Sequence, residues 1–296
     1  MSEAFIKLDF RCNQECLFCC TSDDKDSLSA EEARNLIAKY VNDMGYRTVC
    51  FTGGEPTLRP DLPELVSYAK SLSAEVKLQT NGSLLYDKKI ASQLVDAGVT
   101  RALVSIHSHK DEINDFITNT PGSLQKSLSG IQNLLELGVD IHLAYVITNQ
   151  NIELTDFVRF VKSRFPVINF FLFFLPYPLA RGWRNRQYVP RLGDIEKNLS
   201  ELYGYCKSKG IGFSTRGIPL CYMAGFENHS SETQALMSEE KPMVINDYEV
   251  LEPKHSFEET NVKDDCCKFC AVNDCCGGVW RYYPDIHKHQ LWPVVR

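Results

Sequence analysis

Residues 5–20 read FIKLDFRCNQECLFCC, an apolar strand pattern that runs directly into a cysteine-rich loop. Cys12, Cys16 and Cys19 form a C-x3-C-x2-C triad in this loop. Three thiolates at this spacing can bind three irons of a [4Fe–4S] cluster and leave the fourth iron without a protein ligand. Such an open iron can bind and reduce a small molecule, whereas a fully ligated cluster only carries electrons. The triad therefore predicts a cluster with an open iron.

Zinc, a disulfide framework and an incidental grouping are the alternatives for this triad. A zinc site usually takes four ligands, often from two C-x2-C pairs, and the triad supplies three. Disulfides are typical of small secreted proteins, and the start MSEAFIKLD is not a signal peptide. Twelve cysteines without a secretion signal indicate metal binding in a reducing cytoplasm.

A glycine-rich turn follows the next strand pattern, in the segment TVCFTGGEPTL at residues 48–58. Gly53 and Gly54 let the backbone approach a ligand closely and adopt a positive φ. Glu55, which precedes Pro56, can accept a hydrogen bond from an ammonium group. Glycine-rich turns are common, so this turn alone identifies no function.

Together, the triad, with Phe18 before its last cysteine, and the Gly53–Pro56 turn resemble the signatures of the radical S-adenosylmethionine (SAM) enzymes. The resemblance implies that the three cysteines hold the catalytic [4Fe–4S] cluster and that the turn holds the methionine end of SAM. It implies an oxidoreductase or maturase that reductively cleaves SAM to a 5′-deoxyadenosyl radical, which abstracts hydrogen from a substrate. It also implies a flavodoxin- or ferredoxin-type electron donor.

Strand and helix patterns alternate along the first two thirds of the chain and predict an α/β fold. The expected strands cover residues 5–10, 47–52, 75–80, 101–106, 139–147 and 167–174, with helix patterns between them. Six βα-type units imply a curved parallel sheet with right-handed crossovers. They resemble the partial (β/α)6 TIM-type barrel of the radical SAM core, over roughly residues 1–185. Residues 186–296 then form a small cysteine-rich extension, beginning with a helix at 193–210 that packs against the barrel.

Barrels of this type place their chemistry at the C-terminal ends of the strands. Thr80, Asn81 and Ser105 occupy such ends, and the resemblance makes them candidate contacts to SAM. His107 is a further candidate, for SAM or substrate. The alternatives are a plain turn at Asn81 and a strand hydroxyl satisfied by its neighbours at Ser105. Residues 111–115 are expected to form a solvated acidic loop.

A second group of six cysteines lies between residues 221 and 276: Cys221, Cys266, Cys267, Cys270, Cys275 and Cys276. The pattern C-x2-C-x5-C-G-G resembles the auxiliary-cluster extensions called SPASM and twitch. It implies one further [4Fe–4S] cluster, held by Cys221, Cys267, Cys270 and Cys276. A full SPASM domain would supply ligands for two clusters, but Trp280 stands at the fourth position after the last of these cysteines. The neighbouring cysteine of either doublet could replace its partner, and structural zinc is the main rival.

The resemblance leaves the substrate open. Auxiliary clusters are frequent in maturases that crosslink or epimerise peptides, and a peptide or protein substrate is therefore the leading expectation. The triad begins at residue 12, which leaves no room before it for a leader-peptide-binding domain and weakens that expectation. The alternative is a small-molecule cyclase or carbon–carbon bond-forming enzyme of cofactor or natural-product synthesis. A non-catalytic iron–sulfur protein is the third possibility, but it would not need an open iron.

Composition excludes other classes of function. The net charge of −6 argues against general nucleic-acid binding, and the longest apolar stretch, at residues 170–179, is interrupted by prolines and too short for a membrane span. The arginine-rich segment at 181–191 could hold an anionic substrate, although a solvated surface is the more common role. Cys20, Cys50 and Cys206 are expected to be buried as small hydrophobic residues. Residues 227–264 are expected to form a long loop.

Overall fold

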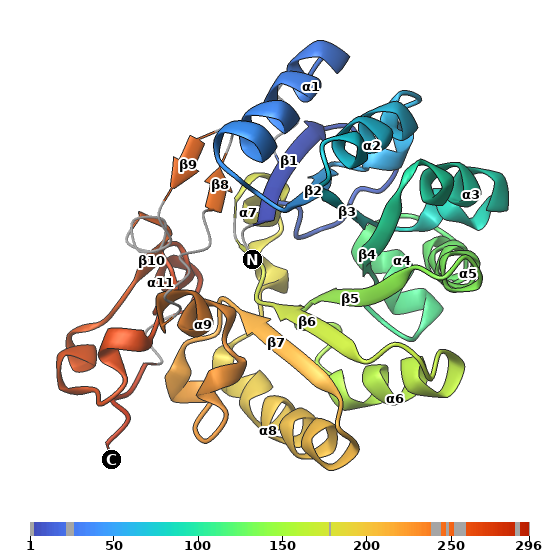
Figure 1. The fold of residues 1–296 in the computed structure, drawn as a ribbon. Coiled ribbons are helices and arrows are strands. Elements are labelled where there is room, and N and C mark those ends of the chain that lie inside the picture. The colour runs from blue at the N-terminus through green and yellow to red at the C-terminus, as the bar shows by residue number, and fades with distance from the viewer. Residues whose placement is uncertain are drawn as a thin grey trace.

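The computed structural model describes residues 3–21, 27–177, 179–237, 244–246, 249–251, 259–287 and 291–295. Its central element is a seven-stranded sheet in the order β1 to β7, in which all neighbouring strands are parallel. The strands are β1 (Glu3–Asp9), β2 (Thr48–Gly53), β3 (Glu75–Thr80), β4 (Val99–Ser105), β5 (Asp140–Val146), β6 (Phe170–Phe174) and β7 (Gly212–Arg216). The sheet curves into a partial barrel with helices on its outer side (Figure 1). The predicted α/β barrel class is confirmed.

The outer helices follow the strands in sequence order. They are α1 (Ala30–Ala38), which continues as a π-helical turn at Lys39–Asp43, α2 (Leu62–Ser71), α3 (Lys88–Ala97), α4 (Asp111–Thr118), α5 (Ser123–Glu136), α6 (Leu154–Arg164), α7 (Ala180–Arg184) and α8 (Leu192–Lys209). Ser29 starts α1 with a capping box: its side chain accepts from the Glu32 N–H, and the Glu32 carboxylate accepts from the Ser29 N–H. Residues 111–118, whose start was expected to be an acidic loop, form α4 instead.

Side chains alternate between the two faces of the sheet. In β6, Phe171 and Phe173 are fully buried on the helix side, whereas Phe170, Leu172 and Phe174 face the inside of the barrel and stay partly exposed. The same alternation holds in β3, where Val76 and Leu78 belong to the buried core. The inner face of the barrel is therefore the more accessible face of the sheet.

The sheet has one strand more than the six predicted. The strand β7 and the helix α8 before it lie beyond residue 185, in the part of the chain that the sequence assigned to the extension. The sequence places an apolar face on this helix at Ile195, Leu199, Leu202 and Cys206; all four are buried, and so is Leu192. Both α8 and β7 therefore belong to the barrel, and the C-terminal part of the chain begins after β7.

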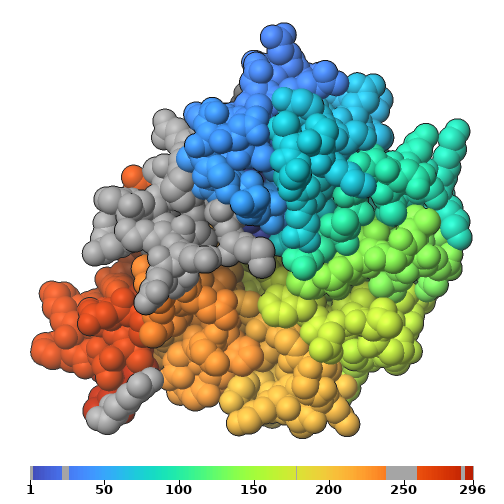
Figure 2. Space-filling view, viewed as in Figure 1, coloured from blue at the N-terminus to red at the C-terminus, as the bar shows by residue number. Residues whose placement is uncertain are grey.

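The C-terminal part contains α9 (Ser231–Met237), β8 (Val244–Asn246), β9 (Glu249–Leu251), β10 (Asn261–Val262), β11 (Val279–Trp280) and α11 (Tyr283–Ile286). It forms a lobe beside the barrel (Figures 1 and 2). The indole N–H of Trp280 donates to the Leu175 carbonyl after β6, at 3.1 Å. The same indole covers Gly217, where a Cβ atom would lie 2.5 Å from it. Trp280 thus joins this lobe to the ends of β6 and β7.

Two further expectations concern the long loop at residues 227–264 and membrane-spanning segments. Of the long loop expected at 227–264, residues 238–243, 247–248 and 252–258 lie outside the described residues. Among the helices that the structure describes, each is too short or too polar to span a membrane.

Candidate active site

The triad lies in the loop that follows β1, and backbone hydrogen bonds hold this loop in place. The N–H groups of Glu15 and Leu17 donate to the carbonyls of the last two residues of α4, at 3.0 and 2.9 Å. On the other side, the Cys19 carbonyl accepts from the N–H of Gly182 in α7, at 3.0 Å. The cluster loop is therefore fixed between two helices at the C-terminal end of the barrel.

The three cysteines lie near enough to one another to interact electrostatically. Cys12 is exposed, and Cys16 and Cys19 are partly exposed. Desolvation raises the pKa of Cys16, and the neighbouring Cys12 and Cys19 raise it further. The Cys12 sulfur accepts from the backbone N–H of Gln14 at 3.4 Å and from the Asn81 side chain at 3.8 Å. A positive group bound among these thiols would favour their thiolate forms.

Glu55 joins the ends of β2 and β3 and is fully buried. Its Oε1 accepts hydrogen bonds from the N–H and hydroxyl of Thr57, at 3.1 and 2.6 Å, and from the Thr80 hydroxyl, at 2.7 Å. Its Oε2 accepts from the Asn81 N–H at 2.7 Å. Burial raises the pKa of Glu55, and these hydrogen bonds oppose the shift. Protein donors therefore already occupy the carboxylate that the sequence assigned to an ammonium group.

The backbone at the end of β1 lies so close to the two glycines before Glu55 that neither position has room for a side chain. Gly53 has φ +132°, and a Cβ atom there would lie 2.2 Å from the Asp9 carbonyl oxygen. A Cβ atom at Gly54 would lie 2.2 Å from the Arg11 carbonyl oxygen. The Gly54 N–H donates to the Asp9 carbonyl at 2.6 Å. The sequence predicted close approach at these glycines, and the structure shows that the approaching group is the backbone leading into the cluster loop.

The predicted SAM contacts at the ends of β3 and β4 differ in availability. Thr80 shares the outward face of Val76 and Leu78, and its hydroxyl bonds Glu55 and the Gly82 N–H. Asn81 donates to Asn13 Oδ1 at 2.8 Å and accepts from Ser83 at 2.9 and 2.7 Å. Ser105 lies on the inward face, is partly exposed, and forms no side-chain hydrogen bond to any described residue.

His107 is buried between the cluster loop and β5. Its Nδ1 accepts from the Val146 N–H at 3.1 Å, so the proton of the neutral ring lies on Nε2. Its ring meets Phe18 edge-on, with 4.7 Å between the ring centroids. Burial lowers the pKa of His107 to about 3. A neutral Nε2–H donor therefore lies behind the aromatic residue of the triad motif, and it has no partner within the described part of the chain.

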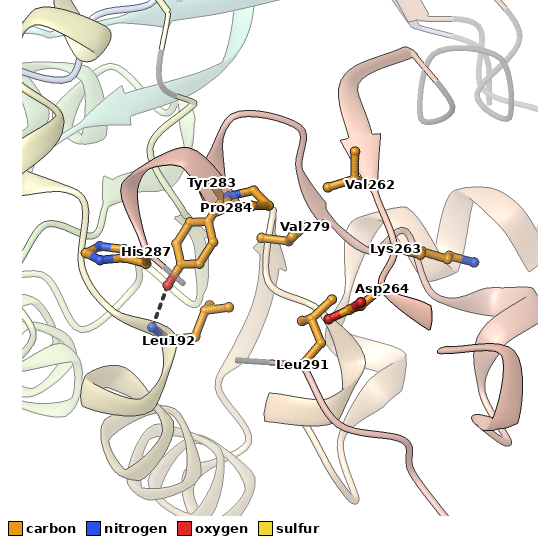
Figure 3. A pocket seen from close by; sticks show the side chains of 9 residues that line it. All are labelled: Leu192, Val262, Lys263, Asp264, Val279, Tyr283, Pro284, His287 and Leu291. Atoms are coloured by element: carbon orange, nitrogen blue, oxygen red, sulfur yellow. Dashed lines mark hydrogen bonds between the residues drawn. The ribbon is translucent and has the colours of Figure 1, made fainter. Parts of the chain in front are cut away.

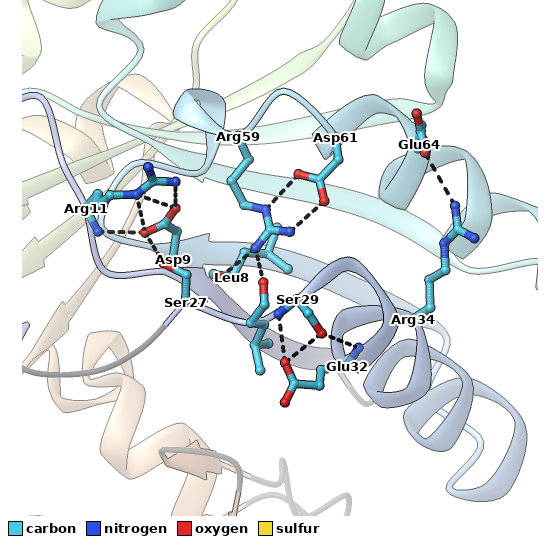
Figure 4. Close-up of polar contacts among 11 residues, drawn as sticks. Leu8, Asp9, Arg11, Ser27, Ser29, Glu32, Arg34, Arg59, Asp61 and Glu64 are labelled. Atoms are coloured by element: carbon cyan, nitrogen blue, oxygen red, sulfur yellow. Dashed lines mark hydrogen bonds and ion pairs between the residues drawn. The ribbon is translucent and has the colours of Figure 1, made fainter.

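A polar network fixes the end of β1 before the triad (Figure 4). Asp9 accepts from the Arg11 backbone and guanidinium and from the Ser27 hydroxyl, at 2.5–3.1 Å. Burial opposes ionisation of Asp9, but these hydrogen bonds outweigh it and hold its pKa well below the usual value. Arg59 is buried, donates to the carbonyls of Leu8 and Leu28, and pairs with a neighbouring aspartate through both of its carboxylate oxygens. These hydrogen bonds join the end of β1 to the residues just before α1. The two ends of the chain segment that contains the triad are therefore held together.

The second cysteine group surrounds a cavity beside the end of β7. Its lining includes all four predicted ligands, Cys221, Cys267, Cys270 and Cys276. Cys276 accepts from the N–H groups of Leu220 and Gly278, at 3.5 and 3.4 Å. Burial raises the pKa of Cys221 to about 12. Across the described residues, no three His, Cys, Asp or Glu side chains meet closely enough to hold a single metal ion.

The structure separates the members of each cysteine doublet. Cys266 does not line the cavity, and its thiol donates to the Leu291 carbonyl at 3.5 Å. Cys275 also lies off the cavity and donates to the Val272 carbonyl at 3.5 Å. The cavity therefore favours Cys267 and Cys276, the members that the sequence motif selected.

Other sequence expectations have mixed outcomes. Cys50 and Cys206 are buried as expected, but Cys20 is exposed beside the triad. Within the arginine-rich segment, Arg186 stacks on the Trp183 ring, with 4.9 Å between the guanidinium and the ring centroid. That segment holds the cluster loop through the Gly182 N–H and through the Asn185 side chain, which donates to the Leu17 carbonyl at 3.2 Å.

The sequence analysis missed residues that support the two sites. Asn13, between two cysteines of the triad, links Asn81 and Ser83 through its side chain. Trp292 lines the second cysteine cavity. Asn13 could have been found from its place inside the motif, whereas no sequence pattern connects Trp292 with cysteines many residues away.

The chain is similar to several proteins of known function. A probable GTP 3′,8-cyclase of Sulfolobus acidocaldarius is 39% identical over 163 residues, which are 53% of this chain and 51% of that protein. An AdoMet-dependent heme synthase of Oleidesulfovibrio alaskensis is 34% identical over 215 residues, 71% of this chain and 55% of that protein. The chain thus spans about half the length of these curated relatives.

Solved structures share the fold at lower identity. The anSMEcpe structure with bound AdoMet and the Cp18Cys peptide is 18% identical, with a TM-score of 0.69 over 99% of this chain and 92% of that chain. Streptococcus suis SuiB bound to S-adenosylmethionine is 17% identical, with a TM-score of 0.68 over 99% of this chain and 76% of that one. The family model described as the radical SAM superfamily matches residues 7–161. With this match over half of its length, the chain belongs to the radical SAM superfamily.

Proposed function

We propose that this radical SAM enzyme cleaves SAM reductively at the triad and abstracts a hydrogen atom from a small-molecule substrate, assisted by a second iron–sulfur cluster. The observation that carries the proposal is the position of the triad. Its loop follows β1, and Asn81 links Cys12 to the carboxylate that joins the ends of β2 and β3. The cysteines and the proposed SAM-binding turn therefore belong to one connected network.

In this proposal Cys12, Cys16 and Cys19 hold a [4Fe–4S] cluster whose fourth iron has no protein ligand. The fit rests on the chemistry of the donors: three neighbouring, accessible thiols on a loop held at both ends by helices. Such a cluster, with SAM bound, would supply the one-electron reduction of SAM and thereby the radical that takes a substrate hydrogen. The electron comes from a flavodoxin- or ferredoxin-type donor. The loop holds the thiols in place, and the barrel excludes water from the reacting groups.

The residues proposed to contact SAM divide into two groups. Ser105 and His107 offer a hydroxyl and an Nε2–H that have no partner among the described residues. Gly53, Gly54, Glu55 and Pro56, with Thr80 and Asn81, act through the backbone, because their side chains or hydrogen atoms already contact protein. The N–H groups of Gly54 and Glu55 also bond the Asp9 and Arg11 carbonyls, so the turn is proposed to present backbone carbonyl oxygens to the methionine end of SAM.

The second site is proposed to hold one [4Fe–4S] cluster on Cys221, Cys267, Cys270 and Cys276. Four thiols around one cavity, with backbone N–H groups directed at their sulfurs, match the donor set of such a cluster. A cluster with four protein ligands carries electrons, and zinc offers no redox change. The proposed role is to exchange an electron with the substrate after hydrogen abstraction.

The substrate class follows from the relatives with the higher identity. The names of the cyclase and the heme synthase refer to small molecules, GTP and heme, and the two proteins share 39% and 34% identity with this chain. A peptide substrate is the second candidate, and the C-x2-C-x5-C-G-G pattern favours it because it resembles that of peptide-modifying enzymes. The proposal therefore prefers the small-molecule class, which was the alternative on sequence alone.

Substrate fractions can separate the two classes. The anaerobically reconstituted enzyme, with dithionite and SAM, would be supplied with metabolite extract divided into small molecules and peptides. We expect the small-molecule fraction to increase 5′-deoxyadenosine formation above the substrate-free rate. Protease treatment of the extract provides the control and should leave this increase unchanged. Stimulation by the peptide fraction alone, lost after protease treatment, would overturn the small-molecule assignment.

A further inference from the structure

Residues 291–295, here called the C-terminal strap, lie across the second cysteine cavity. Leu291 and Trp292 line this cavity together with the four cysteines. The Val294 N–H donates to the Cys270 sulfur at 3.3 Å. The Val294 carbonyl accepts from the Ala271 N–H at 2.9 Å, so one residue of the strap bonds both Cys270 and its neighbour.

A second set of contacts lies at Cys221. The backbone of Trp292 hydrogen-bonds the Cys221 thiol. The Trp292 ring packs against the ring of Tyr222, with 4.2 Å between the centroids. The Leu291 carbonyl accepts from the thiol of Cys266. The strap therefore contacts the cysteines of both segments that form the site, one after β7 and one near the C-terminus.

Apolar packing anchors the strap. Leu291 also lines a neighbouring pocket with Val262, Val279 and Tyr283, which come from β10, β11 and α11 (Figure 3). The Tyr283 hydroxyl accepts from the Leu192 N–H at 2.8 Å, which ties this pocket to the start of α8. The position of the strap is thus fixed by side chains outside the cysteine site as well as by hydrogen bonds at the sulfurs.

From this arrangement we infer that the C-terminal strap shields the second cluster and raises its reduction potential through the Val294 N–H, which is directed at the sulfur of Cys270. Reduction adds negative charge to a cluster, and N–H donors at its sulfurs stabilise that charge. Solvent exposure also changes the potential, and the strap covers one side of the cavity. The inference rests on the proposed cluster at this site and adds a function for residues beyond the cysteine motif.

A proline substitution isolates the hydrogen bond. The background is the Cys12→Ala, Cys16→Ala, Cys19→Ala variant, so that only the second site can bind a cluster. Val294→Pro removes the N–H that bonds Cys270 and keeps the carbonyl that bonds Ala271. Proline at 294 also fixes φ at that residue and favours an extended backbone at Pro293, so equal iron content is the check that the strap stays in place. Val294→Ala keeps both backbone groups and is the matched control.

The readout is the midpoint potential from a redox titration followed by electron paramagnetic resonance, with iron content measured in parallel. We expect Val294→Pro to have a lower midpoint potential than Val294→Ala at equal iron content. Truncation after Gln290 should release iron faster to bathophenanthroline disulfonate, because it uncovers the cavity. Val295→Ala should change neither quantity, because Val295 is 84% exposed.

The possible outcomes separate a failure of the strap's proposed role from a failure of the proposed second cluster. Equal potentials for Val294→Pro and Val294→Ala, with a loaded cluster in both, would overturn the role of the strap and leave the second cluster intact. An iron release rate that truncation after Gln290 does not change would overturn the shielding. Stoichiometric zinc without iron in the parent variant would instead remove the proposed cluster and the inference with it.

Discussion

Because Gly54 has no side chain, the turn after β2 can lie in contact with the backbone that follows β1. Its absent Cβ would lie 2.2 Å from the Arg11 carbonyl oxygen, directly before the triad. Because backbone cannot yield there as a flexible side chain could, Gly54→Ala should displace the start of the cluster loop. We expect a loss of about 1–3 kcal/mol in unfolding free energy, as for overpacked sites. Iron content should fall together with SAM binding.

Gly204→Ala provides the matched control. Gly204 lies exposed in α8, and a Cβ atom there would meet nothing within 4 Å. Alanine in a helix interior should stabilise the protein by about 0.5–1 kcal/mol and leave iron content unchanged. Chemical denaturation and iron analysis measure both variants. If Gly54→Ala bound iron normally and lost only SAM affinity, the glycine would serve the ligand rather than the loop.

His107 predicts a pH dependence of stability. Its pKa in the folded protein is about 3, against an ordinary value of 6.5, because the ring is buried. Below pH 6.5 the unfolded chain takes up a proton that the folded chain refuses, so stability falls as the pH falls from 6.5 towards 3. The loss from this group between pH 7.5 and pH 5.5 is about 1.4 kcal/mol.

His107→Asn tests this value, because the asparagine oxygen can accept from the Val146 N–H and does not titrate. Urea denaturation at the two pH values should show a smaller acid loss in the variant than in the wild type. An identical loss in both proteins would show that His107 does not remain neutral in the fold.

At the residue scale, the alternation of side chains between the two faces of a strand predicts the direction of some site residues. Ser105 shares the inward face of Leu103, and Thr80 shares the outward face of Leu78, as alternation in the sequence already indicates. Both residues were predicted as SAM contacts from their positions at strand ends, without use of this alternation. The partners of Asn81 could not be predicted, because Asn13 is 68 positions away in sequence.

At the scale of elements, Arg59 connects β1, the segment before α1 and the start of α2 (Figure 4). Arg59→Ala would leave the Leu8 and Leu28 carbonyls without this donor and Asp61 without its ion pair. We expect a loss of about 2–4 kcal/mol in unfolding free energy, because the arginine is buried.

Arg34→Ala is the control for this change, since Arg34 and its partner Glu64 are both exposed. Exposed ion pairs contribute below about 1 kcal/mol, so this variant should unfold close to the wild type. Thermal unfolding compares the two. Equal losses for the two arginines would mean that the buried network does not hold the end of β1.

Helices and strands with clear periodicity were predictable, and those that depend on tertiary contacts were not. The continuous apolar run at 167–174 predicted β6, the pattern EVKLQT predicted β3, and the apolar face of α8 was visible in the sequence. The short strand β7, GFSTR, has little apolar character, and it is a strand because it pairs with β6. In α4, the acidic residues of the first turn suit the positive end of the helix, although they suggested a loop.

At the scale of the whole molecule, Trp280 connects the two parts of the enzyme. Trp280→Ala removes its hydrogen bond to Leu175 and its cover over Gly217. Truncating a buried tryptophan costs about 3–5 kcal/mol, and here the loss should appear as separation of the C-terminal lobe. We expect faster limited proteolysis after β7 and weaker iron retention at the second site.

Phe269→Ala is the matched variant in the same lobe, because Phe269 is 81% exposed. Its proteolysis rate and iron content should equal those of the wild type. Equal behaviour of the Trp280 and Phe269 variants would show that other contacts attach the lobe.

The central claim is tested most directly by iron content and SAM cleavage in the Cys12→Ala, Cys16→Ala, Cys19→Ala variant. The anaerobically reconstituted wild type should hold about eight irons, as two [4Fe–4S] clusters, and form 5′-deoxyadenosine with dithionite. The variant should retain about four irons at the second site and form no 5′-deoxyadenosine. SAM cleavage at the wild-type rate in the variant would contradict the account.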